Sequence, residues 1–188
     1  MSAALVELWP LAVGLLGLGL GLTLWWVFRR KARGAPRARL ERAAEHLLSD
    51  VLLPHAETGK IHVGHILLTR SAILVLDLRE ANGHVFGSEA MQEWTVLDRN
   101  RRFTFANPLP LLYDRIAAVK RIVPDLPVRG LVLFGAGSQF SKGFPPHVMR
   151  FDDLVRELEA DRGVTAEGTS ADALASAWTA LEAASRGV

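Results

Sequence analysis

The sequence feature that most limits how this chain can fold is an apolar run that ends in charge. Residues 73–76 are Ile, Leu, Val and Leu without interruption, a pattern typical of a strand buried on both faces. Asp77 and Arg79 follow, and because side chains alternate along a strand, both project from one face while the flanking leucines project from the other. Charge at the end of a core strand is costly unless it is paired or used. We therefore expect the chemistry of this protein at Asp77 and Arg79.

Around this strand, the residue pattern predicts helices that alternate with short strands. Predicted helices cover residues 37–51, 107–123, 151–161 and 171–185. Predicted strands cover residues 65–69, 73–79, 84–87, 94–97, 102–105 and 128–134, and a loop rich in Gly, Ser and Pro covers residues 135–146. The first helix is predicted from apolar residues at helical spacing, and it should end before Pro54. This order predicts an α/β fold, a mixed sheet with helices packed on it.

Residues 8–28 form an uncharged, apolar segment near the start of the sequence. As a helix, with about 1.5 Å of rise per residue, the segment spans roughly 30 Å, the thickness of a bilayer core. Glu7 precedes it and Arg29-Arg30-Lys31 follow it, so the order of charges is the reverse of that in a signal peptide. We expect a single-pass transmembrane helix in the cytoplasmic (inner) membrane, with residues 1–7 outside and the remaining chain in the cytoplasm.

Basic residues are concentrated just after this segment. Six of the 22 Lys and Arg residues lie between residues 29 and 39, whereas from residue 40 onward 16 basic residues stand against 19 acidic ones. We interpret residues 29–39 as a juxtamembrane linker that attracts anionic lipid headgroups, with a nucleic-acid-binding arm as the other interpretation. The chain has no cysteine, which excludes disulfides and thiolate metal sites.

Several short motifs of the remaining chain resemble the nuclease-related domain (NERD) family. In order, they are HILLT at 65–69, ILVLDLREANG at 73–83, HVFG at 84–87, Trp94, FANPL at 105–109 and VLF at 132–134. The resemblance implies a restriction-endonuclease-like fold of the PD-(D/E)xK type, in which a mixed sheet is flanked by helices. It assigns residues 40–150 to a NERD-like domain and leaves residues 151–188 as C-terminal helices.

The resemblance also implies a catalytic pattern. In that pattern, an aspartate on one strand and a glutamate on the next hold Mg²⁺, a lysine two residues after the glutamate positions or deprotonates a water, and a helix glutamine supports the site. Gly64 stands where the aspartate is expected, and Asp77 replaces the glutamate. Arg79 replaces the lysine, and Leu111 falls near the glutamine position. Arginine keeps the positive charge, but it stays protonated at neutral pH and therefore cannot act as a base.

Residues that match this pattern are candidates for a vestigial site. The resemblance gives Asp77, Arg79 and Glu41 as the catalytic set, and Asp77, Glu41 and Glu45 as metal ligands. The simpler interpretation is a salt bridge between Asp77 and Arg79, with Glu41 as a further partner. The other is a residual metal site in which His62 or His65 substitutes as a ligand. We expect no cofactor, or Mg²⁺ if the site is active.

These features predict a membrane-anchored NERD-domain protein whose nuclease site is degenerate and which acts as a binding or scaffold module. A metal-dependent DNA or RNA nuclease with an altered active site is the alternative. A third interpretation is a purely structural membrane-associated protein. Because the catalytic set is incomplete at Gly64, Arg79 and Leu111, the sequence leaves open whether the chain is an enzyme.

Two further segments are candidates for binding partners. Arg99, Arg101 and Arg102 lie near Phe103 and could contact nucleic acid, although an exposed hairpin tip with solvated arginines is the simpler explanation. The helix predicted over residues 171–185 has an apolar face that suits either a protein partner or the rest of its own domain.

Overall fold

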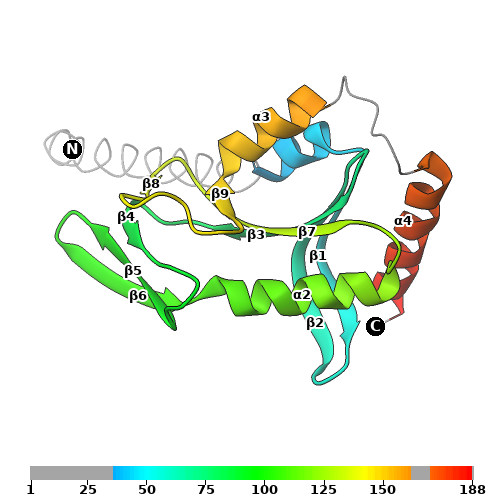
Figure 1. Cartoon of the computed structure of the whole chain (residues 1–188), viewed down its shortest axis with the longest axis horizontal. Helices are drawn as coiled ribbons and strands as arrows, with labels where there is room; N and C mark the ends of the chain where they lie inside the picture. The colour runs from blue at the N-terminus through cyan, green and yellow to red at the C-terminus, as the bar shows by residue number, and fades with distance from the viewer. Residues whose placement is uncertain (1–35, 162–169, 188) are drawn as a thin grey trace, which may run out of the picture. The chain divides into compact units, whose positions relative to one another are not determined.

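The chain folds around a central strand, β3 (Ile73–Arg79), which has the bounds predicted from the sequence. In a computed structural model of the protein, the described residues are 36–161 and 170–187. They form a five-stranded sheet in the order β1-β2-β3-β7-β9 and a four-stranded sheet in the order β6-β5-β4-β8 (Figure 1). The predicted α/β class is therefore confirmed.

The elements follow one another in a mixed order. The first sheet contains β1 (His46–His55), β2 (Gly59–Leu68), β3, β7 (Val128–Phe134) and β9 (Val148–Arg150). The second sheet contains β4 (Gly83–Phe86), β5 (Glu93–Asp98), β6 (Arg101–Ala106) and β8 (Ser138–Gln139). The helices with stated bounds are α2 (Pro108–Ile122), α3 (Phe151–Asp161) and α4 (Ala171–Arg186), and residues 36–43 are also helical. β1, β2 and β3 pair antiparallel, whereas β3, β7 and β9 pair in parallel.

Apolar side chains of β3 enter two separate cores, one on each face of the first sheet. Val75 belongs to a cluster that includes Leu112 of α2. Leu76 belongs to a second cluster that includes Leu154 of α3. This alternation is that of the predicted strand, and continuing it by one residue places Asp77 on the α2 face.

The predicted helix over residues 37–51 is wrong in its second half. Helical backbone ends at residue 43, and the following residues form β1, which pairs with β2 along its length. Pro54, which was expected to follow a helix, lies within this strand. β1 is an edge strand, and an edge position tolerates a residue that has no amide hydrogen to donate.

A reversal of the buried face explains why the apolar residues of β1 show helical spacing in the sequence. Leu48 and Val51 are three residues apart, yet both pack against the same core cluster. Between them lies Asp50, whose φ of +53° departs from strand geometry. A strand with such a reversal shows the three-residue apolar spacing that normally indicates a helix.

The segment predicted as a loop over residues 135–146 contains one very short strand and is followed by another. β8 pairs in parallel with β4, with Ser138 opposite Gly83, and β9 pairs with β7. Phe140 of this segment packs edge-on against Phe134, with 5.1 Å between the ring centroids. Strands of two or three residues are too short to show a periodic pattern, so the sequence did not reveal them.

The last helix, α4, packs back on its own domain. Leu174, Trp178 and Leu181 are buried in the same cluster as the α2 face of β3. The Trp178 ring also stacks on His46 of β1, with 5.4 Å between the ring centroids. The apolar face that suggested a protein partner is therefore covered by this protein's own β1 and α2.

Between residues 36 and 161 and between 170 and 187, no helix is long and apolar enough to cross a membrane. The predicted transmembrane segment, residues 8–28, lies outside the described residues. The preceding residues 1–7 and most of the basic linker lie outside them as well.

Candidate functional site

Asp77 lies near the end of β3, where it is covered by α2. Its backbone pairs with Val132 of β7, and the residue is only 9% exposed. On the other side, β2 pairs His65 with Leu76, so that the next residues along the two strands, Gly64 and Asp77, face each other. Residues opposite each other in an antiparallel pair are close neighbours, so position 64 lies beside Asp77 in the sheet.

The helix α2 brings a buried arginine to this aspartate. Its start is fixed by Asn107, whose side chain accepts a hydrogen bond from the Leu109 amide at 3.0 Å, and by Pro108 in the first turn. Leu112 and Val119 are buried on the face that packs on β3. Arg115 lies between them at helical spacing and is only 7% exposed.

Two guanidinium groups hold the Asp77 carboxylate. Arg79 approaches one oxygen, Oδ2, with Nε at 2.9 Å and Nη2 at 2.8 Å. Arg115 approaches the other, with Nη1 3.3 Å from Oδ1, while its Nε donates a hydrogen bond to the His62 carbonyl at 2.8 Å. The ion pair between Asp77 and Arg79 that was predicted from the sequence is present, and a second cation is added to it.

Arg115 was missed in the sequence, although a signal was available. A charged residue on the buried face of an amphipathic helix, midway between Leu112 and Val119, is rarely accommodated without a partner. In the described part of the chain, its Nη1 is a buried nitrogen without a hydrogen-bond partner, because the contact with Asp77 is an ion pair that lacks hydrogen-bond geometry. The cluster therefore carries two positive charges and one negative charge.

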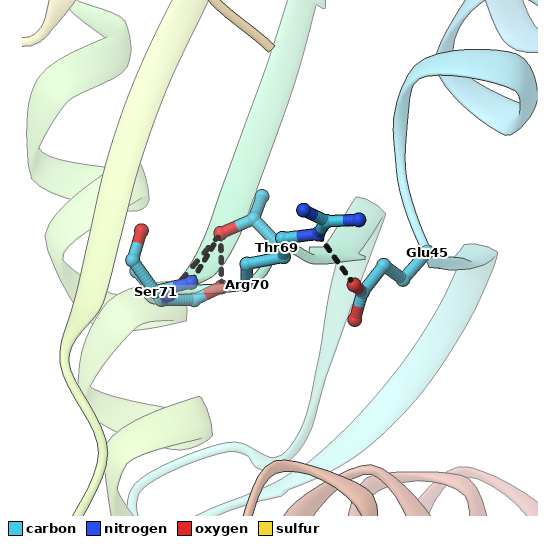
Figure 2. Close-up of polar contacts among 5 residues, drawn as sticks. Glu45, Thr69, Arg70 and Ser71 are labelled. Carbon is cyan, nitrogen blue, oxygen red and sulfur yellow. Dashed lines mark hydrogen bonds and ion pairs between the residues drawn. The ribbon is translucent and has the colours of Figure 1, made fainter. Parts of the chain in front are cut away.

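Glu45 is separate from this cluster. Its carboxylate accepts a hydrogen bond from Nε of Arg70 at 3.3 Å, as Figure 2 shows. Arg70 belongs to the turn between β2 and β3, where the Thr69 hydroxyl accepts hydrogen bonds from the Ser71 and Ala72 amides. Both charged side chains of this pair are about half exposed, so its contribution to stability is small.

Glu41 is an exposed residue of the helical segment 36–43. The buried residues of that segment, Leu40 and Ala43, pack in the cluster on the α3 side of the sheet, on the face opposite Asp77. Within the two described stretches, no three acidic or histidine side chains are grouped so that they could hold a metal ion. The structure therefore does not bring Glu41, Glu45 and Asp77 together as a ligand set.

The structure also gives the surroundings of the other residues that were considered as catalytic positions or as metal ligands. His65 has Nδ1 2.9 Å from the Ser49 hydroxyl, and His62 has Nε2 3.4 Å from Asp50. Leu111 is 41% exposed on α2. A Cβ added at Gly64 would have only one described atom within 4 Å, the Leu76 carbonyl oxygen at 3.5 Å.

This arrangement does not suit a divalent cation. Mg²⁺ needs several oxygen ligands in near-octahedral geometry, of which one or two are usually carboxylates. At Asp77, both carboxylate oxygens face guanidinium nitrogens, which would repel a metal ion. The donor set present does not fit Mg²⁺.

The three arginines considered for nucleic acid lie on the β5–β6 hairpin and do not share one face. Arg99 occupies the turn with a φ of +51°, and Arg101 and Arg102 are neighbours on β6, so their side chains project to opposite faces. Arg101 is opposite Asp98 of β5. Phe103 is 46% exposed beside them.

Tyr113 of α2 forms a hydrogen bond with a loop near the start of the helix. Its hydroxyl donates a hydrogen bond to the Glu89 carboxylate at 2.7 Å. This hydrogen bond raises the pKa of Tyr113, because deprotonation would remove the bond and place two negative charges together. The Asn107 amide donates to the Met91 carbonyl of the same loop at 2.8 Å.

The mixed fold and the order of the motifs are consistent with a nuclease-related class of protein. The sequence pattern of the NERD family, the nuclease-related domain, matches residues 30–135. Because this is more than half of the chain, the protein belongs to the NERD family. The resemblance inferred from the motifs is confirmed at this level.

One similar protein is an uncharacterized protein of Bacillus anthracis, pXO1-01. The two are 20% identical over 128 residues, which cover 65% of this chain and 60% of the relative. The match thus spans less than two thirds of that relative's length. No solved structure shows significant similarity to this chain.

Proposed function

We propose that this chain is a single-pass membrane-anchored NERD-domain protein whose nuclease-like site no longer supports metal-dependent cleavage and serves as a binding or scaffold module. One observation carries the proposal: both oxygens of the Asp77 carboxylate are engaged by the arginines at 79 and 115. A carboxylate in that state is a poor metal ligand.

The chemistry of phosphodiester hydrolysis supports this choice. A PD-(D/E)xK-type nuclease uses a metal ion to lower the pKa of a water and to stabilise the charge of the transition state. Here no group of side chains in the described part of the chain fits a metal, and Arg79 cannot accept a proton at neutral pH. Without these aids, the barrier to hydrolysis approaches that of the very slow uncatalysed reaction.

The proposed membrane anchor is supported by the sequence. Residues 8–28 are uncharged and apolar, and the basic residues of 29–39 follow them. By the positive-inside rule, this order places the NERD domain in the cytoplasm, beside the inner leaflet of the membrane. Contacts with lipid headgroups through the basic linker, with nucleic acid through the β5–β6 hairpin and with a protein through the C-terminal helices of residues 151–188 stay predictions.

We expect the full-length protein in detergent to leave single- and double-stranded DNA and RNA intact in the presence of Mg²⁺ or Mn²⁺. Gel assays over many hours should show the same background for the natural chain and for Asp77→Asn, which keeps the shape of the side chain. Metal-dependent cleavage by the natural chain that disappears in Asp77→Asn, while circular dichroism shows that variant to be folded, would establish the alternative, an active nuclease with an altered site.

A partial restoration tests the alignment with the catalytic pattern. The double variant Gly64→Asp/Arg79→Lys returns a carboxylate and a lysine to the strand positions where the pattern expects them, and it should gain measurable Mn²⁺ binding by calorimetry. Gly64→Ala/Arg79→Gln is the matched control that supplies neither group. If the two double variants bind Mn²⁺ equally poorly, the alignment of Gly64 with the missing aspartate is wrong.

A second prediction concerns the anchor. In cell fractionation, the full chain should remain in the membrane pellet after alkaline carbonate extraction, because an apolar helix of this length inserts almost irreversibly. Replacing Leu16 and Leu18 with arginine should release the protein, since each arginine near the helix centre costs about 2.5–3.5 kcal/mol of insertion free energy. Leu16→Ile/Leu18→Ile is the control that keeps the segment apolar. Equal release of both double variants would argue against a membrane-spanning segment.

A further inference from the structure

The segment that joins the two sheets ends in the one asparagine of this chain that a glycine follows. Asn82 precedes Gly83, the first residue of β4, and it is exposed. The other two asparagines precede Arg101 and Pro108. A backbone nitrogen can attack the side-chain amide of the asparagine before it, and glycine permits this attack best because it has no side chain in the way. Asn82 is therefore the asparagine of this chain with the most reactive neighbour.

The fold requires the glycine of this pair. Gly83 has a φ of +104°, in a region that residues with a Cβ rarely adopt. An added Cβ would also lie 2.2 Å from the Leu97 carbonyl oxygen of β5, which is a backbone atom and cannot rotate away. A larger residue at position 83 would therefore disturb the pairing of β4 with β5, so the fold keeps the reactive pair.

The backbone next to β8 holds both reacting groups. The Gly83 amide donates a hydrogen bond to the Gly137 carbonyl at 2.8 Å. The side-chain oxygen of Asn82 lies against the same glycine, since a Cβ added at Gly137 would be 2.1 Å from it. Next along the chain is β8, whose two residues pair with β4 (Figure 1). The Gly83 nitrogen can attack only when this segment moves away, and a pairing this short opens at a low free energy.

We propose that Asn82 is a modification site, at which deamidation is controlled by the release of β8 from β4. Once the Gly83 amide is free, its nitrogen bonds to Cγ of Asn82, and the bond from Cγ to Nδ2 breaks. Nδ2 leaves as ammonia and takes up the proton that the Gly83 nitrogen loses. Water then adds to one of the two carbonyl carbons of the cyclic succinimide, which opens to aspartate or isoaspartate at position 82.

Either product weakens the pairing of β4 with β8. Aspartate places a negative charge beside the Gly137 backbone, and isoaspartate adds a methylene group to the main chain just before Gly83. Because Gly83 is opposite the buried Ser138, the added length disturbs the register of the two strands. Residues 135–146 then leave the second sheet more often, which opens the backbone at Lys142 to trypsin.

The test incubates the full-length protein in detergent, at neutral and at mildly alkaline pH, and follows each asparagine by peptide mass spectrometry. Conversion should occur at Asn82, leave Asn100 and Asn107 intact, and quicken as the pH rises, because the deprotonated amide is the attacking group. It should be at least about tenfold slower in the native protein than in concentrated urea, because the native reaction waits for local opening. Asn82→Gln should remain unmodified, because its longer side chain closes a ring far more slowly.

The control by β8 is tested by loosening the turn before it. The Ser138 hydroxyl donates a hydrogen bond to the Gly135 carbonyl at 2.7 Å, so Ser138→Ala should speed conversion about fivefold in the native protein and leave the rate in urea unchanged. Ser71→Ala, in an exposed turn of the first sheet, is the matched control and should change neither rate. If Ser138→Ala does not fold, urea below the unfolding transition gives the same test: hydrogen exchange of the Gly83 amide and conversion of Asn82 should rise in proportion.

Trypsin digestion measures the consequence of the modification. After incubation, cleavage at Lys142 should be at least about fivefold faster than in the fresh natural chain, whereas Asn82→Gln should show no such change. The inference is overturned if Asn82 converts as fast in the native protein as in urea, or stays intact in the native protein throughout. It is equally overturned if conversion does not follow the opening of the Gly83 amide, or if modified and fresh chains are cleaved alike. None of these outcomes depends on the nuclease-like site or the membrane anchor.

Discussion

Replacing Asp77 with alanine is expected to lower the free energy of unfolding by about 3 kcal/mol. The substitution leaves Arg115 buried beneath α2 with no negative charge beside it, and removing one partner of a buried ion pair is strongly destabilising for that reason. Urea denaturation followed by near-UV circular dichroism measures the change, since its signal reports side-chain packing around the sheet.

Two comparisons separate this cause from a general loss of packing. Arg79→Gln should cost less than about 1 kcal/mol, because the Arg79 side chain is 36% exposed and water screens its charge. The double variant Asp77→Leu/Arg115→Met should recover most of the loss, since apolar side chains of similar size remove both buried charges together. A cost below about 1 kcal/mol for Asp77→Ala would mean that Arg115 does not depend on this carboxylate.

Replacing Trp94 with alanine is expected to have a similarly large effect, about 4 kcal/mol. Trp94 lies on β5 of the second sheet and is fully buried, yet its ring stacks on Phe134 of the first sheet with 6.2 Å between centroids. Its indole nitrogen also donates a hydrogen bond to the Ser88 carbonyl at 3.1 Å. The substitution opens a cavity where the two sheets meet, and it should lower Tm by about 10 °C.

A matched aromatic substitution serves as the control. Phe103→Ala on neighbouring β6 removes a ring that is 46% exposed, and it should cost less than about 1 kcal/mol. Gly87→Ala tests the fit of the indole from the other side, because its Cβ would lie 2.1 Å from Trp94 Cδ2. If Trp94→Ala were no more damaging than Phe103→Ala, the second sheet would be held to the first by other contacts.

Most of the fold could be predicted where the pattern is local. β3, β7 and α2 each bury a continuous run or a helical stripe, so their bounds follow from hydrophobic periodicity. β1 could not be predicted, because its face reversal at Asp50 depends on pairing with β2, and that pairing is not local. The sequence shows the apolar spacing but not the partner that converts it into a strand.

The candidate site was predictable in part for the same reason. Asp77 and Arg79 are two residues apart on one strand, so strand geometry alone places them together. Arg115 joins them from a helix 38 residues further along the chain, and only the packing of α2 on the sheet brings it there. The resemblance placed Glu41 and Glu45 beside Asp77. In the structure, the buried neighbours of Glu41 pack on the opposite face of the sheet, and Glu45 pairs with Arg70.

The parallel pairing of β3 with β7 sets an order of events during synthesis. Ile73 pairs with Val128, so one edge of β3 has no partner until the ribosome has produced β4, β5, β6 and α2 and then β7 itself. Until then, the run from Ile73 to Leu76 is an open apolar edge that can pair with another nascent chain. Fast translation at high temperature should therefore favour inclusion bodies, and slower production in the cold should favour the native protein.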